Sequence, residues 1–134
     1  MIVVDSSAFI EYYRPSGEPV ARAAVSDAIR SDLVVVNGII QVELMAFAAR
    51  EADHASLGAD FQAFHWLELG RRDFDLAAEI GFGMRSKGIT IPATDLIIAA
   101  CAIHSGAILY HLDAHFDRIA QHTNLDARHL GQQR

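Results

Sequence analysis

The sequence has 134 residues, 51% of them hydrophobic and 21% charged, which is typical of one folded domain and excludes a disordered chain. Its 17 acidic residues outnumber 11 basic ones, and the resulting net charge of −6, taken alone, argues against a nucleic-acid-binding protein. The N-terminus does not resemble a signal peptide, and no apolar run approaches the roughly 18–20 residues of a membrane span. The single cysteine, Cys101, lies in the apolar run LIIAACAI, so we expect a buried thiol in a reducing cytoplasm.

In chain order, short apolar runs alternate with segments of helical length. Strands are predicted at Ile2–Val4, Leu33–Val36, His65–Leu69 and Ala107–Tyr110. Helices are predicted at Ser7–Tyr13, Val20–Arg30, Ile39–Arg50, Ala55–Phe64, Phe74–Ser86, Leu96–His104 and Ala114–His122, and Gly70–Asp73 is predicted to be a polar connection. Short apolar strands without alternation indicate a parallel sheet that helices cover on both faces. We therefore predict an α/β fold: a three-layer α/β/α sandwich around a short, mainly parallel sheet of four to five strands. It forms a single domain over residues 1–134, with a tail from about residue 125 that could be flexible.

Four acidic residues map to one edge of this predicted sheet. Asp5 ends the first strand, Glu43 lies in the second turn of the helix after the second strand, Asp95 opens the helix that begins near Leu96, and Asp113 follows the last strand. In a parallel sheet, the carboxyl ends of the strands and the first turns of the following helices share an edge. Carboxylates gathered there would repel one another unless cations lay between them, so the pattern indicates a metal site.

Three of these acids also have structural interpretations. Asp5 could cap the first helix, Asp95 could cap a later one, and Asp113 could be an ordinary turn residue. Ser6 and Ser7 could cap the first helix equally well, and we expect them to do so if Asp5 is a ligand.

Glu43 is harder to explain structurally. It stands in GIIQVELMAFAAR, where the helix is apolar almost all round and only Gln41 and Glu43 are polar. An unpaired carboxylate among apolar neighbours is costly unless it is protonated or bound to a cation. Glu43 is therefore the strongest single indication of a site.

Four segments in this order, IVVDSSAFIE, GIIQVELMAF, IPATDLIIAACAI and ILYHLDAHFDRIA, resemble the PIN-domain ribonucleases, and more closely the VapC toxins of VapBC toxin–antitoxin modules. The resemblance covers about residues 1–124 and implies a Mg²⁺- or Mn²⁺-dependent endoribonuclease that cleaves RNA. It implies that the catalytic, metal-binding carboxylates are Asp5, Glu43, Asp95 and Asp113. It also suggests Ser7 and Thr94 as hydroxyls that orient these carboxylates, and Asp117 as a peripheral fifth acid.

The same resemblance implies partners. A small VapB-type antitoxin would cover the apolar surface and place a basic side chain among the acids, and the toxin would form a homodimer and a hetero-oligomer with the antitoxin. The apolar helix Ile39–Ala49 is the candidate contact surface. If the four acids bind cations, 13 acids remain against 11 basic residues, and the net charge no longer excludes an RNA substrate. Basic residues that could flank the site are Arg14, Arg85, Lys87 and Arg118.

The sequence departs from the family pattern around the last acid. His111 stands where relatives often have Thr or Ser, and His115 stands where they often have another acid. The run His111-x-Asp113-x-His115 could also be a transition-metal site, because imidazole suits Mn²⁺, Zn²⁺ or Ni²⁺ better than Mg²⁺. These departures motivate an alternative, a catalytically silent PIN-like protein-binding module. A third hypothesis, a metal-dependent phosphatase, ranks last because Ser7 interrupts the usual D-x-D pattern after the first strand.

Overall fold

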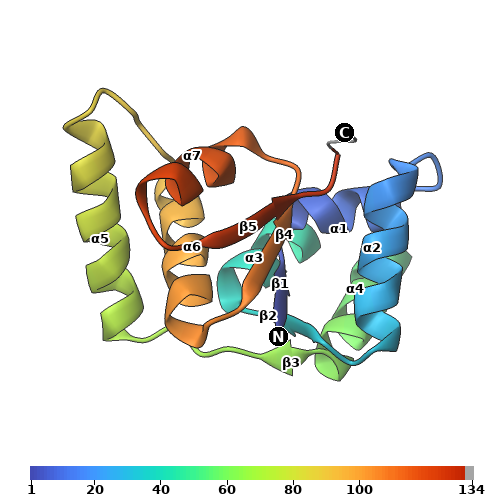
Figure 1. Cartoon of the computed structure of the whole chain (residues 1–134). Coiled ribbons are helices and arrows are strands. Elements are labelled where there is room, and N and C mark those ends of the chain that lie inside the picture. The colour runs from blue at the N-terminus through green and yellow to red at the C-terminus, as the bar shows by residue number, and fades with distance from the viewer. Residues whose placement is uncertain (132–134) are drawn as a thin grey trace.

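The computed structural model describes residues 1–131 and forms one five-stranded sheet in which every neighbouring pair is parallel. The spatial order is β3-β2-β1-β4-β5, so the first strand lies at the centre (Figure 1). The strands are β1 (Ile2–Val4), β2 (Val34–Val36), β3 (His65–Trp66), β4 (Ile108–His111) and β5 (Asp126–His129).

Helices cover both faces of this sheet, with α2 and α4 on one side and α5 and α6 on the other (Figure 1). The helices are α1 (Ser6–Tyr13), α2 (Pro19–Arg30), α3 (Gly38–Met45), α4 (Glu51–Ala63), α5 (Arg71–Arg85), α6 (Ala93–Ser105) and α7 (Ala114–His122). The prediction of a three-layer α/β/α sandwich around a parallel sheet is therefore confirmed. Among the described residues, none of the helices combines the length and the apolar character needed to cross a membrane.

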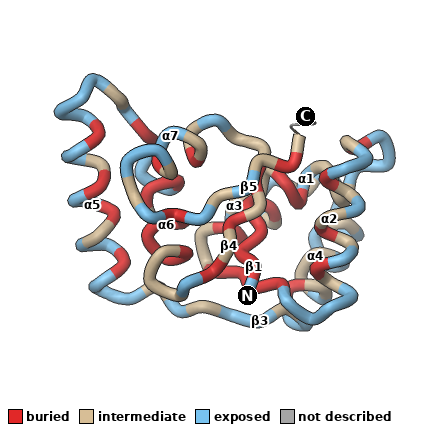
Figure 2. The backbone as a smooth tube through the Cα atoms, viewed as in Figure 1, coloured by how far each residue is buried: buried red, intermediate tan, exposed pale blue. Residues whose placement is uncertain are grey.

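The core forms where the central strands meet the helices. Val3 is fully buried and pairs with Val35 on one side and Leu109 on the other, so its side chain has no solvent-facing position. Strands buried in this way read as continuous apolar runs, as IVV and VVV do here. Figure 2 shows the burial concentrated in the central strands, while β3 and the outer faces of α2 and α5 are exposed. The β1 strand is thereby rigidly placed, together with the residue that follows it.

The boundaries of four helices differ by three residues or more from the sequence prediction, among them α6, which begins at Ala93 instead of Leu96. The helix predicted at Ile39–Arg50 ends at Met45, where the His54 ring nitrogen Nδ1 lies 2.9 Å from the Met45 carbonyl oxygen. A new helix, α4, then begins at Glu51 instead of Ala55. The predicted polar connection Gly70–Asp73 instead contains the start of α5, because Asp73 is buried and accepts the Gly70 N–H at 2.8 Å.

The fifth strand lies in the segment for which the sequence indicated only a tail. β5 pairs in parallel with β4 along Asp126–His129, and the Leu130 N–H donates to the His111 carbonyl at 2.8 Å. Its sequence, DARH, is mostly polar and its residues alternate between exposed and half-buried positions. This edge strand is held by backbone pairing with β4 and has no continuous apolar face. The segment from about residue 125 is thus part of the sheet up to His129, in contrast to the predicted flexible tail.

Candidate active site

Asp5, Glu43, Asp95 and Asp113 come from four elements at the carboxyl edge of the sheet. Asp5 follows β1, Glu43 lies on α3, Asp95 lies in the first turn of α6, and Asp113 follows β4. The structure brings them into electrostatic contact, since neighbouring members of the group raise the pKa of Asp5, Glu43 and Asp95. The edge therefore concentrates negative charge, as the order of the elements predicted.

Asp5 serves two purposes with its two carboxylate oxygens. Oδ2 caps α1 by accepting the Ser7 N–H at 3.0 Å and the Ser7 hydroxyl at 2.6 Å. Ser7 Oγ in turn accepts the Leu112 N–H at 3.0 Å, so the ends of β1 and β4 are joined through this carboxylate. Oδ1 is buried and has no hydrogen-bond partner among the described residues. The expectation that Ser6 and Ser7 would do the capping is wrong, because one Asp5 oxygen caps while the other remains free for a ligand.

The environment of Asp5 opposes its ionisation. Burial raises its pKa to about 6, and the negative charges of Glu43 and Asp95 act in the same direction, while the hydrogen bonds from Ser7 oppose the shift. The side chain is only 3% exposed, so water cannot compensate the unpaired oxygen. A buried carboxylate with a free oxygen indicates a cation at this position.

Glu43 is half-buried and is held by Ser6, whose hydroxyl donates to Glu43 Oε1 at 3.0 Å. Burial raises its pKa, and Asp95 and Asp113 raise it further, against the effect of the Ser6 hydrogen bond. The helix that carries it is fixed by the fully buried Asn37, whose side-chain oxygen accepts the N–H groups of Ile39 and Ile40. Sequence analysis missed Asn37, although an Asn between a buried strand and a helix is a typical N-cap signal.

Asp95, Asp113 and His115 form the tightest part of the site, with one ligand atom of each within 4.8 Å of the others. His115 Nδ1 lies 2.9 Å from Asp95 Oδ2 and 3.3 Å from Asp113 Oδ1. Burial raises the pKa of Asp95, and the charge of Asp113 adds to this rise, while the contact with His115 opposes it. Asp95 is buried and Pro92 occupies the N-cap position of α6, so Asp95 is not a helix cap.

A second cluster lies beside the site and contains His111, Asp117 and His129. His111 is fully buried, and burial lowers its pKa to about 4, so the ring is neutral at pH 7. Its Nδ1 accepts the Asp113 N–H at 3.1 Å, and His129 Nδ1 likewise accepts the Gly131 N–H at 3.3 Å. A neutral ring that accepts at Nδ1 carries its proton on Nε2, and His111 Nε2 faces Asp117 Oδ1 at 3.5 Å. His111 Nε2 is nevertheless buried without a hydrogen-bond partner among the described residues, so its proton is unsatisfied beside Asp117.

The residues at the carboxyl edge fit a hard divalent cation. Several carboxylate oxygens converge there, and the free Asp5 Oδ1 is the donor type that Mg²⁺ and Mn²⁺ prefer. Ser7 orients Asp5 as the resemblance implied. Thr94, in contrast, is exposed, and no hydrogen bond joins its hydroxyl to a carboxylate within residues 1–131.

Comparison with known proteins places this arrangement in a family. The PIN-domain family model matches residues 2–121. This chain is a PIN domain. It is also 35% identical over 133 residues to ribonuclease VapC11 of Mycobacterium tuberculosis, covering 95% of this chain and 97% of that protein. A second relative, VapC18 of the same organism, is 28% identical over 123 residues, with coverage of 87% and 85%. The chain therefore belongs to the VapC-type PIN domains.

Solved structures share the PIN-domain fold. The chain matches FitAcB from Neisseria gonorrhoeae with a TM-score of 0.76 and 21% identity, covering 95% of this chain and 96% of that chain. It matches VapBC2 from Rickettsia felis, bound to a DNA fragment from its promoter, with a TM-score of 0.76 and 19% identity, covering 96% and 98%. At these identities the likeness supports the fold alone.

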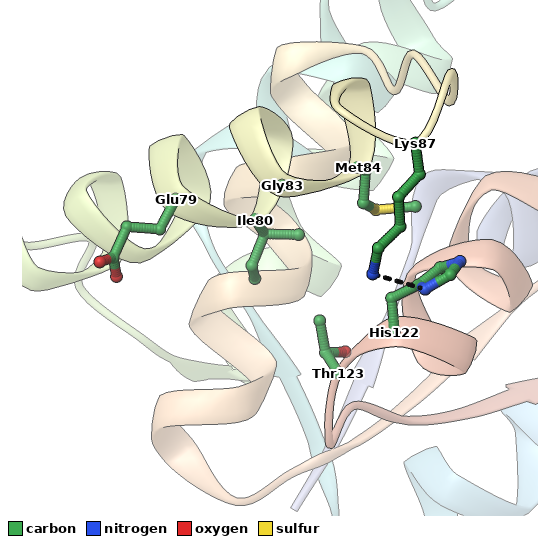
Figure 3. A pocket seen from close by; sticks show the side chains of 7 residues that line it. All are labelled: Glu79, Ile80, Gly83, Met84, Lys87, His122 and Thr123. Carbon is green, nitrogen blue, oxygen red and sulfur yellow. Dashed lines mark hydrogen bonds between the residues drawn. The ribbon is translucent and has the colours of Figure 1, made fainter.

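A pocket and a groove of this PIN domain lie away from the four candidate carboxylates. A pocket of about 210 Å³ between α5 and α7 is lined by Lys87 and His122, whose nitrogens Nζ and Nδ1 lie 3.3 Å apart, and by none of the four carboxylates (Figure 3). Arg85 and Arg118 are also exposed, and Arg14 pairs with Glu11 at 2.8 Å. A larger apolar groove of about 550 Å³ runs between α1, the end of α3 and α4, and includes Ile10, Leu44 and Leu57.

Proposed function

We propose that this chain is the ribonuclease toxin of a VapBC-type module, a metal-dependent endoribonuclease that acts in the cytoplasm and is neutralised by a cognate antitoxin. The observation that carries the proposal is the buried, unpartnered Oδ1 of Asp5 at an edge where three further carboxylates converge. The 35% identity to ribonuclease VapC11 over nearly the whole chain supports RNA as the substrate.

In this proposal Asp5, Glu43, Asp95 and Asp113 hold Mg²⁺ or Mn²⁺. A divalent ion bound there would activate water and stabilise negative charge on a scissile phosphate. The chain supplies the positioning. Ser7 fixes Asp5 through two hydrogen bonds, and Ser6 fixes Glu43 through one. The His111 ring holds the backbone of Asp113 by accepting its N–H. The buried sheet behind these residues keeps the carboxylates in place before RNA arrives, which limits reorganisation during the reaction.

The experiment compares Asp5→Asn and Asp95→Asn with wild type for RNA cleavage in Mg²⁺ or Mn²⁺ and for growth inhibition in cells. Both variants should lose at least about 100-fold in cleavage rate and should not inhibit growth, because each amide weakens a shared cation site. Asp126→Asn, on the exposed edge strand, is the matched control and should retain wild-type cleavage. Full toxicity of both site variants would refute the proposal.

One observation favours the alternative of a catalytically silent protein-binding module. His115 bridges Asp95 and Asp113, where it could fill the place of a cation with its own N–H. Calorimetry would support this alternative if wild type bound neither Mg²⁺ nor Mn²⁺ yet still bound its protein partner.

For partners, we propose a VapB-type antitoxin in the apolar groove and a second copy of the chain on α3. The groove lined by Ile10, Leu44 and Leu57 lies beside Arg14 and Arg50 and offers an apolar floor with charged rims. Just beyond the end of α3 lies Phe47, which is 84% exposed and is costly to leave in water.

A further inference from the structure

The geometry points to His115 as a metal ligand. We propose that its imidazole Nδ1 coordinates the divalent ion beside Asp95 and Asp113, and that this nitrogen makes the site select Mn²⁺ over Mg²⁺. The inference rests on the proposed function and deepens it by naming the ligand that determines the choice of ion.

The spacing of the three side chains suits one coordination shell. His115 Nδ1 lies 2.9 Å from Asp95 Oδ2 and 3.3 Å from Asp113 Oδ1. Adjacent ligands in an octahedral shell with bonds of about 2.1 Å lie about 3.0 Å apart. The observed separations therefore match those of neighbouring ligands of a single ion.

The backbone holds the ring in this position. Asp113 is the N-cap of α7, and its Oδ1 accepts the His115 N–H at 2.9 Å. Asp95 is buried in the first turn of α6, a helix that packs against α7. The start of α6 thus places the Asp95 carboxylate beside the Asp113 carboxylate and the His115 imidazole at the start of α7.

The two nitrogens of the His115 ring allow it to act as a ligand, unlike those of His111. Within residues 1–131 only Nδ1 of His115 is engaged, and the side chain is 39% exposed. When an ion binds, the proton can therefore reside on Nε2 in water while Nδ1 offers its lone pair. In His111, by contrast, Nδ1 already accepts the Asp113 N–H, so the ring proton resides on Nε2. Nε2 is the nitrogen that would have to bind an ion, and while it is protonated it has no free lone pair.

A second, independent observation indicates a cation at the same edge. Asp5 Oδ1 is buried without a partner, and the charges of Glu43 and Asp95 act on Asp5 directly. Mg²⁺ favours all-oxygen shells, whereas Mn²⁺ accepts imidazole readily. A carboxylate at position 115 would give an all-oxygen shell that suits Mg²⁺. The imidazole of His115 shifts the preference toward Mn²⁺.

Pulsed electron paramagnetic resonance of Mn²⁺ bound to the full chain tests the inference directly. Wild type should show the coupling of a directly coordinated ¹⁴N nucleus, and His115→Ala should lose it. His122→Ala, an exposed histidine at the far end of α7, is the control and should retain the signal.

Calorimetry supplies a second readout that does not depend on catalysis. His115→Ala should weaken Mn²⁺ binding by at least about tenfold, because even outer partners of a ligand cost that much. His115→Asp should lower the ratio of Mn²⁺ to Mg²⁺ affinity by strengthening Mg²⁺ binding.

The outcomes separate this inference from the nuclease proposal. Mn²⁺ bound without nitrogen coupling, coupling that persists in His115→Ala, or tighter Mn²⁺ binding by that variant would overturn the role of His115 alone. Failure of wild type to bind either Mn²⁺ or Mg²⁺ would overturn both.

Discussion

At the scale of single residues, the unusual chemistry of Asp5 has a measurable cost in stability. Its pKa is about 6 in the folded protein against an ordinary value of 3.8, so the native state binds this proton more tightly than the unfolded chain does. The free energy of unfolding should therefore fall as the pH rises from about 4 to about 6, and the whole cost should be present above pH 6.

Asp5→Asn should remove this cost. In metal-free buffer at pH 7.5 we expect the variant to gain on the order of 2 kcal/mol in free energy of unfolding, measured by urea denaturation. At pH 3.5, where the wild-type carboxyl is largely protonated in both states, the gain should nearly disappear. Asp126→Asn should change little at either pH, and a variant destabilised at pH 7.5 would show that Oδ1 has a favourable partner.

The candidate site could be largely predicted from sequence because each acid occupies a topologically special position. Asp5, Asp95 and Asp113 follow a strand or open a helix, and the parallel sheet brings such positions together. The role of Ser6 could not be predicted, because a hydroxyl at a helix start has many local partners. Only the packed structure shows that Ser6 reaches Glu43, 37 residues away.

At the scale of elements, the start of α5 depends on one buried carboxylate. Asp73 accepts the Gly70 N–H at 2.8 Å and lies 2.8 Å from His104 Nδ1 on α6. Burial alone would raise the pKa of Asp73, but these two hydrogen bonds outweigh it, and the pKa is lowered. The carboxylate therefore stabilises the fold above pH 3.8, and this contribution is lost as the pH falls through the lower folded-state pKa.

Asp73→Asn should accordingly lower the free energy of unfolding by about 2 kcal/mol at pH 7, and the loss should shrink below pH 4. Thermal denaturation between pH 3 and pH 7 measures both effects. Asp75→Asn, which disturbs only the exposed pair with Arg71, is the matched control. A loss that stays constant across this pH range would contradict the assignment.

The sequence predicted elements well where their burial is uniform and poorly where it is not. β1 and β2 were found because both are entirely apolar. β5 was missed because its polar residues alternate between exposed and half-buried positions at a sheet edge. The break between α3 and α4 was predicted several residues too late, because Ala46–Ala49 read as a continuing helix, while the contact of His54 with the Met45 carbonyl is not local.

At the scale of the whole molecule, the apolar groove and the exposed side chain of Phe47 predict two separable assemblies. Ile10→Asp in the groove should prevent antitoxin binding and leave a toxic homodimer. Binding would have to bury the new carboxylate without a partner, which costs a large free energy of desolvation. Phe47→Asp, just beyond the end of α3, should instead leave antitoxin binding intact and break the homodimer. Sedimentation of each variant coexpressed with its antitoxin distinguishes the outcomes, and each variant serves as the control for the other. Loss of both assemblies in either variant would refute the division of surfaces.

The central position of β1 has a consequence for biosynthesis. Its backbone is paired with β4, and Ser7 is joined to Leu112 across 105 residues of sequence. Asp5 therefore leaves the ribosome early but cannot meet Asp95 and Asp113 until nearly the whole chain has followed. A nascent chain that lacks the later segments has no assembled carboxylate cluster, so the proposed activity can arise only after nearly the whole chain has been made.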